Sequence, residues 1–320
     1  MRCIFCLDEK PGLLFTDEHV FPKAIGGRFV IRNVCKRCND LLGSRVDCRL
    51  TEHVVVQAAR GALDLAGKGG RVPKLLEHMA LAGKPGHRLV NRLDAHGKPQ
   101  HYLVPHVERR TNADGCESVS IVVDVSDRDR LPEMLNKMRS RAGLSILPSD
   151  EIQSRAQVVC TPHPVMEKHF TVDEHEYKRC ILKIAYELTC HWLGEGYLDD
   201  PHAELMRRCV VSEEAPDEEM TRLFFDRIDY HEDGGLGRFW DFEEDSHLGM
   251  LTPLWTEAGI AAYVRIFKIF EGTLLVSRCS VAERYPSIEG MFVGNPVCGG
   301  EVRELTLRRE ISRNRRNPSP

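Results

Sequence analysis

The chain has 320 residues, and its 44 Lys and Arg against 48 Asp and Glu give a formal net charge of −4 at pH 7. A composition this close to neutral, with 42% hydrophobic residues, excludes a uniformly basic nucleic-acid binder, a fibrous protein and wholesale disorder. The sequence has no run near the roughly 20 apolar residues of a membrane span, and its first ten residues lack the apolar region of a signal peptide. We therefore expect a soluble, cytoplasmic protein of about two domains without a membrane partner.

The N-terminal region contains two Cys-x-x-Cys pairs, which are Cys3 with Cys6 and Cys35 with Cys38. Four thiolates are the full ligand set of a tetrahedral zinc site, and such a site is structural because it leaves no open coordination position. The 28 residues between the pairs exceed the usual spacing of about 15–20, so this loop has room for a site of its own. Four reduced core cysteines are the alternative. The other eight of the twelve cysteines are scattered singly, and we interpret them as packing residues.

The loop and the residues after it carry a motif that resembles the zinc-stapled HNH endonucleases. Its parts, in chain order, are the first cysteine pair, Glu18-His19-x-x-Pro22, Gly26-Gly27, the second pair followed by Asn39, and Gly43-x-x-x-Asp47. The resemblance covers residues 3–47, and residues 182–187 followed by Gly194 have a weak similarity to the C-terminal parts of some bacterial HNH proteins. It implies a ββα-metal fold, with His19 on the first strand, residues 28–33 near the second strand, and a helix from Lys36 through Asp47. A divalent cation, Mg²⁺ or Mn²⁺, would lie between strand and helix.

His19 is the only histidine in the first 50 residues, and a neutral imidazole can take a proton from water. We therefore predict that His19 is the general base of phosphodiester hydrolysis. The resemblance implies that Asn33 orients His19. It also implies that Glu18 is a ligand of the catalytic cation, as is Asn39, at a position where many family members have His.

Asp47 shares a helix face with Asn39 and Gly43, so it is a further candidate ligand or a neighbour of one. A salt bridge from Asp47 to Arg45 or Arg49 is the alternative. Four basic residues are candidates for binding phosphate, although basic residues on a helix are usually only solvated: Lys23, Arg28, Lys36 and Arg37.

The rest of the chain predicts a mixture of helices and strands. Helices are expected at 51–65, 127–141, 172–193 and 199–208, and strands at 119–125, 221–230 and 261–279, with further strands and turns in 76–107. Within 261–279, Glu271-Gly272 is expected to be the turn of a hairpin. His96, His101 and His106 match no metal-ligand spacing, and we interpret them as surface or core histidines.

We therefore expect an α+β protein in four parts: a nuclease domain at 1–55, a helix and linker at 56–75, a larger α+β region at 76–310, and a mobile basic tail at 311–320. Residues 1–50 carry nine basic and six acidic side chains, whereas residues 212–246 carry thirteen acidic and three basic ones. The small basic unit suits a phosphodiester substrate, and the acidic segment is expected to be a solvated loop. The region 76–310 is expected to serve substrate recognition or regulation.

The leading hypothesis is a metal-dependent HNH endonuclease, a hydrolase acting on nucleic acid, with DNA favoured over RNA. A non-catalytic zinc module that binds nucleic acid or protein is the alternative. The family association further suggests a bacterial nuclease of phage defence or of a mobile element. A homodimer is compatible with the sequence, and no nucleotide cofactor is expected because no phosphate-binding loop occurs.

Overall fold

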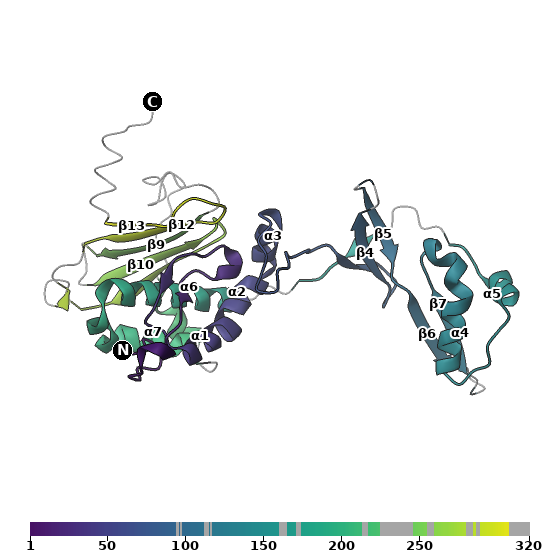
Figure 1. Cartoon of the computed structure of the whole chain (residues 1–320), viewed down its shortest axis with the longest axis horizontal. Coiled ribbons are helices and arrows are strands. Elements are labelled where there is room, and N and C mark those ends of the chain that lie inside the picture. The colour runs from purple at the N-terminus through teal and green to yellow at the C-terminus, as the bar shows by residue number, and fades with distance from the viewer. Residues whose placement is uncertain are drawn as a thin grey trace, which may run out of the picture. The chain divides into compact units, whose positions relative to one another are not determined.

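The computed structural model describes residues 1–93, 96, 98–111, 115, 117–159, 165–170, 174–212, 217–224, 246–254, 259–279, 284–285 and 289–306. They form two units, one of residues 1–73 with 171–320 and the other of residues 74–170 (Figure 1). This division cuts the expected region 76–310 after residue 170, and its C-terminal part shares a unit with the N-terminus. The domain bounds at 55 and 75 stay predictions. The tail 311–320, residues 225–230 and most of the acidic segment lie outside the described residues.

The N-terminus of the first unit has two short strands followed by a helix, as the sequence predicts. Strand β1 (Glu18–His19) pairs antiparallel with β2 (Val30–Ile31), and α1 (Lys36–Leu42) continues through a π-helical turn at Gly43–Asp47 into α2 (Cys48–Glu52). The backbone leaves the helical conformation at His53, with ψ 133°, and resumes it in α3 (Val54–Ala62). The helix expected at 51–65 is therefore two helices. Two short 3₁₀ turns lie in the N-terminal part of the chain, one at Gly12–Leu14 before β1 and one at Lys23–Ile25 between β1 and β2.

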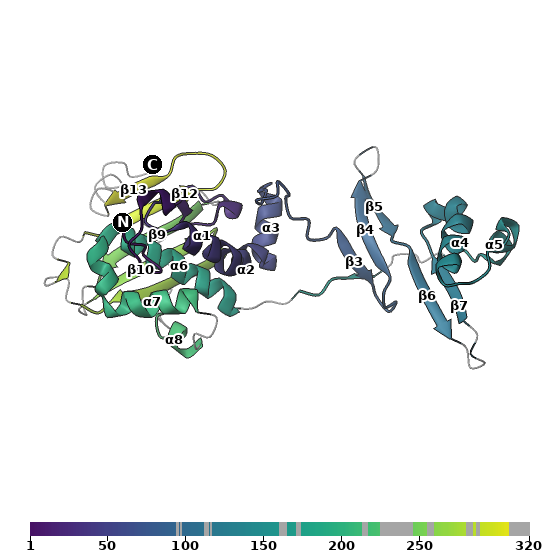
Figure 2. The ribbon, with the colours of Figure 1, turned by 60° about the horizontal axis from the view of Figure 1, so that its bottom comes forward.

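The C-terminal part of the first unit is an antiparallel sheet of five strands in the order β11–β10–β9–β12–β13. The strands are β9 (Ser246–Pro253), β10 (Ile260–Ile266), β11 (Phe270–Ser277), β12 (Met291–Pro296) and β13 (Arg303–Thr306). The helices are α6 (Glu174–Leu193), α7 (Pro201–Val211) and α8 (Asp217–Thr221), with a 3₁₀ turn at Glu195–Asp199. Helices α6 and α7 lie along one face of the sheet (Figures 1 and 2). The fold class is α+β, as expected.

The expected turn at Glu271-Gly272 is wrong. Arg265 pairs with Glu271 and Val264 with Gly272, so both residues lie inside β11. The turn is formed by residues 267–269, where Phe267 has a left-handed φ of 53° and donates its backbone N–H to a buried histidine. Gly272 serves packing instead, because a Cβ there would come within 3.0 Å of Ile181 on α6. The position of the turn is therefore determined by tertiary contacts and not by the local preference of the glycine.

Helix α6 lies at the centre of the core. Every residue from 180 to 190 is buried, and a Cβ on Gly249 of β9 would come within 2.2 Å of Leu188. On its other side the Tyr186 hydroxyl donates to the carbonyl of Ile4. One hydrophobic cluster joins the N-terminal residues, α6 and the sheet. Within the first unit, the N-terminal residues thus share a core with α6 and the sheet, which begin more than a hundred residues later in the chain.

The second unit contains two separate antiparallel sheets. The first sheet has the order β5–β4–β3–β8, and the second pairs β6 with β7. Its elements are β3 (His78–Leu81), β4 (Arg88–Leu93), β5 (Pro99–Leu103), β6 (His106–Thr111), β7 (Glu117–Val122), a 3₁₀ turn (Val125–Arg130), α4 (Leu131–Arg141), α5 (Ser149–Arg155) and β8 (Met166–Glu167). Across the described parts of both units, no helix has the length and apolar character needed to span a membrane.

Candidate active site and zinc site

The four N-terminal cysteines come together, as their spacing predicts. One sulfur atom from each of Cys3, Cys6, Cys35 and Cys38 lies within 4.8 Å of the others. Cys3 and Cys35 are buried, and Cys6 and Cys38 are partly exposed. Four convergent thiols at this spacing fit a tetrahedral zinc ion, whose ligands must be thiolates. The zinc would tie the N-terminal loop to the start of α1, since Cys35 is the residue before that helix.

A lysine lies next to this cluster. The Lys10 ammonium is 3.2 Å from Cys6 Sγ, 3.3 Å from Cys35 Sγ and 3.2 Å from an Asp8 carboxylate oxygen. Four thiolates around one zinc ion leave two negative charges, so a hydrogen-bonding cation at this distance stabilises the loaded site.

We expect Lys10→Met to weaken zinc affinity about 10- to 100-fold, because groups that hydrogen-bond to metal ligands typically contribute this much. Competition with a chromophoric chelator measures the change. Lys36→Met is the matched control, since Lys36 directly follows Cys35 but its ammonium pairs with Asp40 at 2.7 Å in an exposed position. Equal zinc affinities in the two variants would contradict the role of Lys10.

The turn between β1 and β2 is held by the C-terminal sheet. Gly26 has φ 89°, and a Cβ on Gly27 would lie 1.7 Å from the Phe21 carbonyl, so this turn requires both glycines. The buried Asn295 accepts hydrogen bonds from the N–H groups of Arg28 and Phe29 and donates to Gly26 O. Strand β12 thereby fixes the position of β2 opposite β1.

His247 of β9 makes a second connection to this turn. Its Nε2 is 2.8 Å from Ile25 O, its Nδ1 accepts the N–H of Phe267, and its ring stacks on Phe21. Complete burial lowers the pKa of His247 to about 4. The imidazole is therefore neutral and bridges the two parts of the unit.

This buried histidine should make the first unit less stable in acid. The unfolded chain protonates His247 near pH 6.5 and the folded chain near pH 4, so its contribution is complete above pH 6.5 and is lost as the pH falls toward 4. At about 1.4 kcal/mol per pH unit, the loss between pH 7.5 and pH 5 is about 2 kcal/mol. Urea unfolding at both pH values should show this difference shrinking in His247→Gln and unchanged in the exposed His169→Gln. An identical pH dependence of wild type and His247→Gln would refute it.

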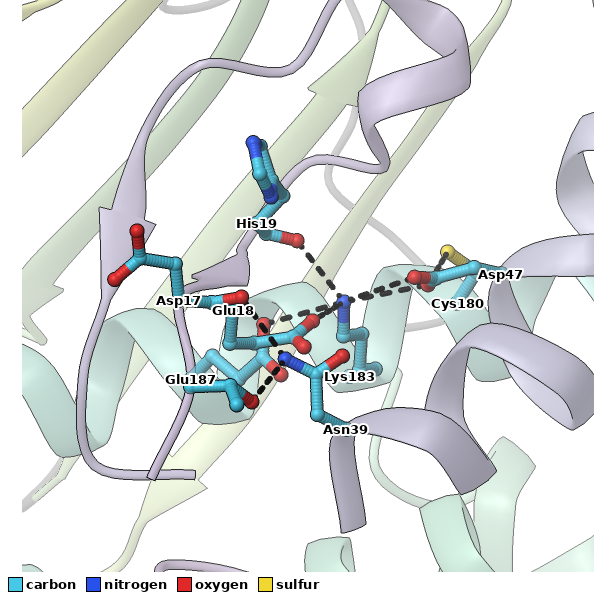
Figure 3. Close-up of polar contacts among 9 residues, drawn as sticks. Asp17, Glu18, His19, Asn39, Asp47, Cys180, Lys183 and Glu187 are labelled. Atoms are coloured by element: carbon cyan, nitrogen blue, oxygen red, sulfur yellow. Dashed lines mark hydrogen bonds and ion pairs between the residues drawn. The ribbon is translucent and has the colours of Figure 1, made fainter. Parts of the chain in front are cut away.

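His19 lies at the end of β1 and is half-buried. Its imidazole points away from Lys183 of α6, whereas its backbone carbonyl accepts a hydrogen bond from that lysine (Figure 3). Burial lowers the pKa of His19, and the charges of Lys23 and Lys183 lower it further. The imidazole is thus neutral at pH 7, the form in which it can accept a proton.

Glu18 and Asp47 meet at a lysine that the sequence motif does not contain. Lys183 of α6 has no exposed surface, and its Nζ lies 2.5 Å from Glu18, 3.2 Å from Asp47 and 3.1 Å from the carbonyl of His19 (Figure 3). Burial opposes the charge of this ammonium, but the three carboxylates around it, those of Asp47, Glu187 and Glu18, raise the pKa of Lys183. A permanent positive charge therefore lies between the two predicted metal ligands.

The third carboxylate is Glu187, one turn along α6. It is completely buried, lies 3.5 Å from Lys183 Nζ, and neither of its oxygens has a hydrogen-bond partner among the described residues. Burial raises the pKa of Glu187. Burial also raises the pKa of Glu18 and of Asp47, so the net charge of the cluster depends on how many of the three carboxyl groups are ionised beside the ammonium.

The carboxyl oxygens of this cluster are donors of the kind that a hard divalent cation prefers. These residues do not form a preformed metal site. The possible ligand atoms of Glu18, Asp47 and His19 are not among the groups of the described residues whose atoms lie close enough together to hold one ion. The ammonium lies in the gap between Glu18 and Asp47, and a bound cation would have to share these carboxylates with it.

The two asparagines of the predicted site have different surroundings. Asn39 on α1 donates to Thr16 Oγ1 at 3.1 Å and to the Asp17 carbonyl at 2.9 Å, which ties the helix to the start of β1. The side-chain oxygen of Asn33 is buried without a hydrogen-bond partner among the described residues. The structure therefore shows no hydrogen bond between that oxygen and His19.

The four candidate phosphate ligands are engaged to different degrees. Arg28 was predicted to bind phosphate. Its guanidinium instead donates hydrogen bonds to the carbonyls of residues 296, 299 and 300 and so holds a loop of the C-terminal sheet. Lys36 pairs with Asp40. Lys23 and Arg37 are exposed, and Lys23 is near enough to His19 to affect its pKa.

Sequence reasoning missed Lys183 and Glu187. At a spacing of four residues on a helix they are indistinguishable from an ordinary exposed ion pair. Besides the weak similarity of residues 182–187, a signal lay in their surroundings, since apolar residues occupy both Ile181–Leu182 and Ile184–Ala185 around Lys183. A lysine flanked in this way lies on the core face unless the whole helix is exposed.

Comparison with known proteins gives a match in the N-terminal region. The sequence model of a family described as HNH endonuclease matches residues 3–55. No curated protein and no solved structure matches the chain.

Proposed function

We propose, from the match of residues 3–55 to the HNH endonuclease model, that the protein is a metal-dependent endonuclease that hydrolyses phosphodiester bonds, DNA in preference to RNA. The observation that carries the proposal is the position of His19. It lies on a strand between the two cysteine pairs, half-buried, with a lowered pKa and next to a buried group of carboxylates.

Hydrolysis needs a base for the attacking water, a counter-charge for the developing oxyanion and groups that hold the phosphate. His19 takes the proton from water, and Asn33 is the proposed orienting residue. Lys23 and Arg37 hold the phosphate through exposed positive charges, and Lys36 can join them if it leaves Asp40. Arg28 acts on phosphate only if it leaves the carbonyls that it binds.

The proposed catalytic cation is Mg²⁺ or Mn²⁺, with Glu18, Asn39 and Asp47 as its protein ligands. When bound, it supplies Lewis-acid stabilisation of the phosphate oxygens. A zinc ion held by the four cysteines would be structural and would tie the N-terminal loop to the start of α1.

The proposal is tested by incubating the purified full chain with supercoiled plasmid, linear DNA and RNA in a series of Mg²⁺, Mn²⁺ and Ca²⁺ concentrations. Cleavage that requires added Mg²⁺ or Mn²⁺ is the expected result. A folded, zinc-loaded protein that cleaves none of these substrates would contradict it.

The second candidate function is a non-catalytic zinc module that binds nucleic acid or protein. The ammonium of Lys183 favours it, because this group already occupies the gap between Glu18 and Asp47. Filter binding without metal, followed by addition of Mg²⁺ or Mn²⁺, distinguishes the two functions, since the module binds the nucleic acid but leaves it intact after the metal is added.

The remaining parts of the proposal are a cytoplasmic location, in which the cysteines stay reduced, and assembly as a homodimer. A role in bacterial phage defence or on a mobile element rests on the family association alone. The neighbouring genes test this role, and light scattering tests the dimer.

A further inference from the structure

The unit of residues 74–170 has little apolar core. Among its described residues only Leu89, Pro132 and Ile152 are buried apolar side chains, and none of them belongs to a hydrophobic cluster found among the described residues. Several of its large apolar side chains are exposed, including Leu76, Ile146 and Val158. Small units that bury so little apolar surface are commonly stabilised by a metal ion or a disulfide.

Three potential metal ligands meet within this unit. One ligand atom from each of His87, His106 and Glu108 lies within 4.8 Å of the others. His106 Nε2 is 3.8 Å from Glu108 Oε1, and the ring centroids of His87 and His106 are 4.4 Å apart. His106 and Glu108 are two residues apart on β6, so both side chains leave the same face of that strand.

The backbone at Gly86 lies very close to the ring of His106. Gly86 has φ 81°, a conformation that side chains rarely adopt, and a Cβ there would lie 2.6 Å from Cε1 of His106. A glycine is therefore required directly before His87. This turn between β3 and β4 brings the buried His87 against the ring of His106.

Two of the three side chains are held by the hydrogen bonds that orient metal ligands in proteins. His87 Nδ1 is 3.4 Å from the Pro85 carbonyl, and donating to this carbonyl leaves the lone pair on Nε2. Glu108 accepts from Arg110 through Oε2 at 2.7 Å, which leaves Oε1 on the side of His106. In known metal sites, ligating histidines and carboxylates usually make such a hydrogen bond through the atom that does not bind the ion.

We propose that His87, His106 and Glu108 bind a divalent transition-metal ion of the zinc class. Two imidazoles and a carboxylate are a known ligand set of zinc, with water in the fourth position, whereas Mg²⁺ prefers oxygen ligands alone. His87 precedes β4 of the four-stranded sheet and the other two ligands lie on β6, so the ion cross-links two sheets that share no strand pairing among the described residues. It thereby supplies stability that the unit's apolar residues do not.

The test measures bound zinc in the full chain, prepared without a histidine tag and dialysed against metal-free buffer. We expect about two zinc ions per wild-type chain, one at the cysteines and one here, and about one in His87→Gln and His106→Gln. His101→Gln is the matched control, because His101 lies in the same unit and hydrogen-bonds to Asn91 in an exposed position. It should retain about two ions per chain.

Cobalt substitution shows which site has been lost. A cysteine site gives intense thiolate-to-cobalt absorption, and His106→Gln should keep this signal while its bound cobalt falls by half. Glu108→Gln, which preserves the shape of the side chain, should weaken the second site at least tenfold with the first intact. One ion per wild-type chain, or unchanged metal content in both histidine variants, would overturn the proposal. This outcome is independent of nuclease activity.

Discussion

His19→Ala should abolish cleavage while leaving the protein folded and zinc-loaded. A positioned general base contributes about 10²- to 10⁴-fold to a hydrolytic rate, and His19 is the only histidine of the first 50 residues. Its imidazole points away from the buried cluster at Lys183 (Figure 3), so its removal should leave that cluster intact. The measurement is the initial rate of plasmid nicking at saturating Mg²⁺ or Mn²⁺, with zinc content and melting temperature measured on the same samples.

His169→Ala is the matched control, because its side chain is 91% exposed and lies in the other unit. It should cleave at the wild-type rate. The proposed function is wrong if His19→Ala retains the wild-type rate, or if both variants and the wild type bind nucleic acid equally without cleavage.

The sequence predicted the parts of this site whose spacing is local. The two Cys-x-x-Cys pairs, the strand at Glu18–His19 and the start of the helix at Lys36 all follow from residues that are close in the chain or joined by one metal ion. The long helix expected at 172–193 is also confirmed, as α6 from 174 to 193. Its apolar spacing is strong enough to predict a helix without knowledge of its neighbours.

What the sequence could not predict depends on contacts between distant segments. His247 and Asn295 hold the glycine turn from strands more than two hundred residues away, and nothing in their local sequence marks them. Arg28 was predicted as a phosphate ligand from its charge, yet it binds backbone carbonyls at the end of β12 and in the loop after it. The sequence shows that residue 28 is positively charged, but it does not show which acceptor the guanidinium meets in the folded protein.

Lys183→Met should be the most destabilising substitution in the first unit. Removing the ammonium leaves Glu18, Asp47 and Glu187 buried without a counter-ion, and breaking a buried ion pair by removing one partner typically costs about 3–5 kcal/mol. Methionine has similar length and no charge, so the cost is electrostatic rather than one of volume. Urea unfolding of the full chain, followed by far-UV circular dichroism, measures the loss. Lys178→Met on the same helix is the matched control, since Lys178 is partly exposed, and should change stability by less than about 0.5 kcal/mol.

A second substitution shows whether charge is the cause. Glu187→Gln removes one of the three buried carboxylates, so Lys183→Met with Glu187→Gln should be more stable than Lys183→Met alone. Added Mg²⁺ or Mn²⁺ should also stabilise Lys183→Met more than the wild type, because the ion can then enter between Glu18 and Asp47 where the ammonium lay. If Lys183→Met is no less stable than Lys178→Met, the buried ammonium does not organise this site. If the wild type gains as much stability from the metal as Lys183→Met does, the divalent cation binds without competing with Lys183.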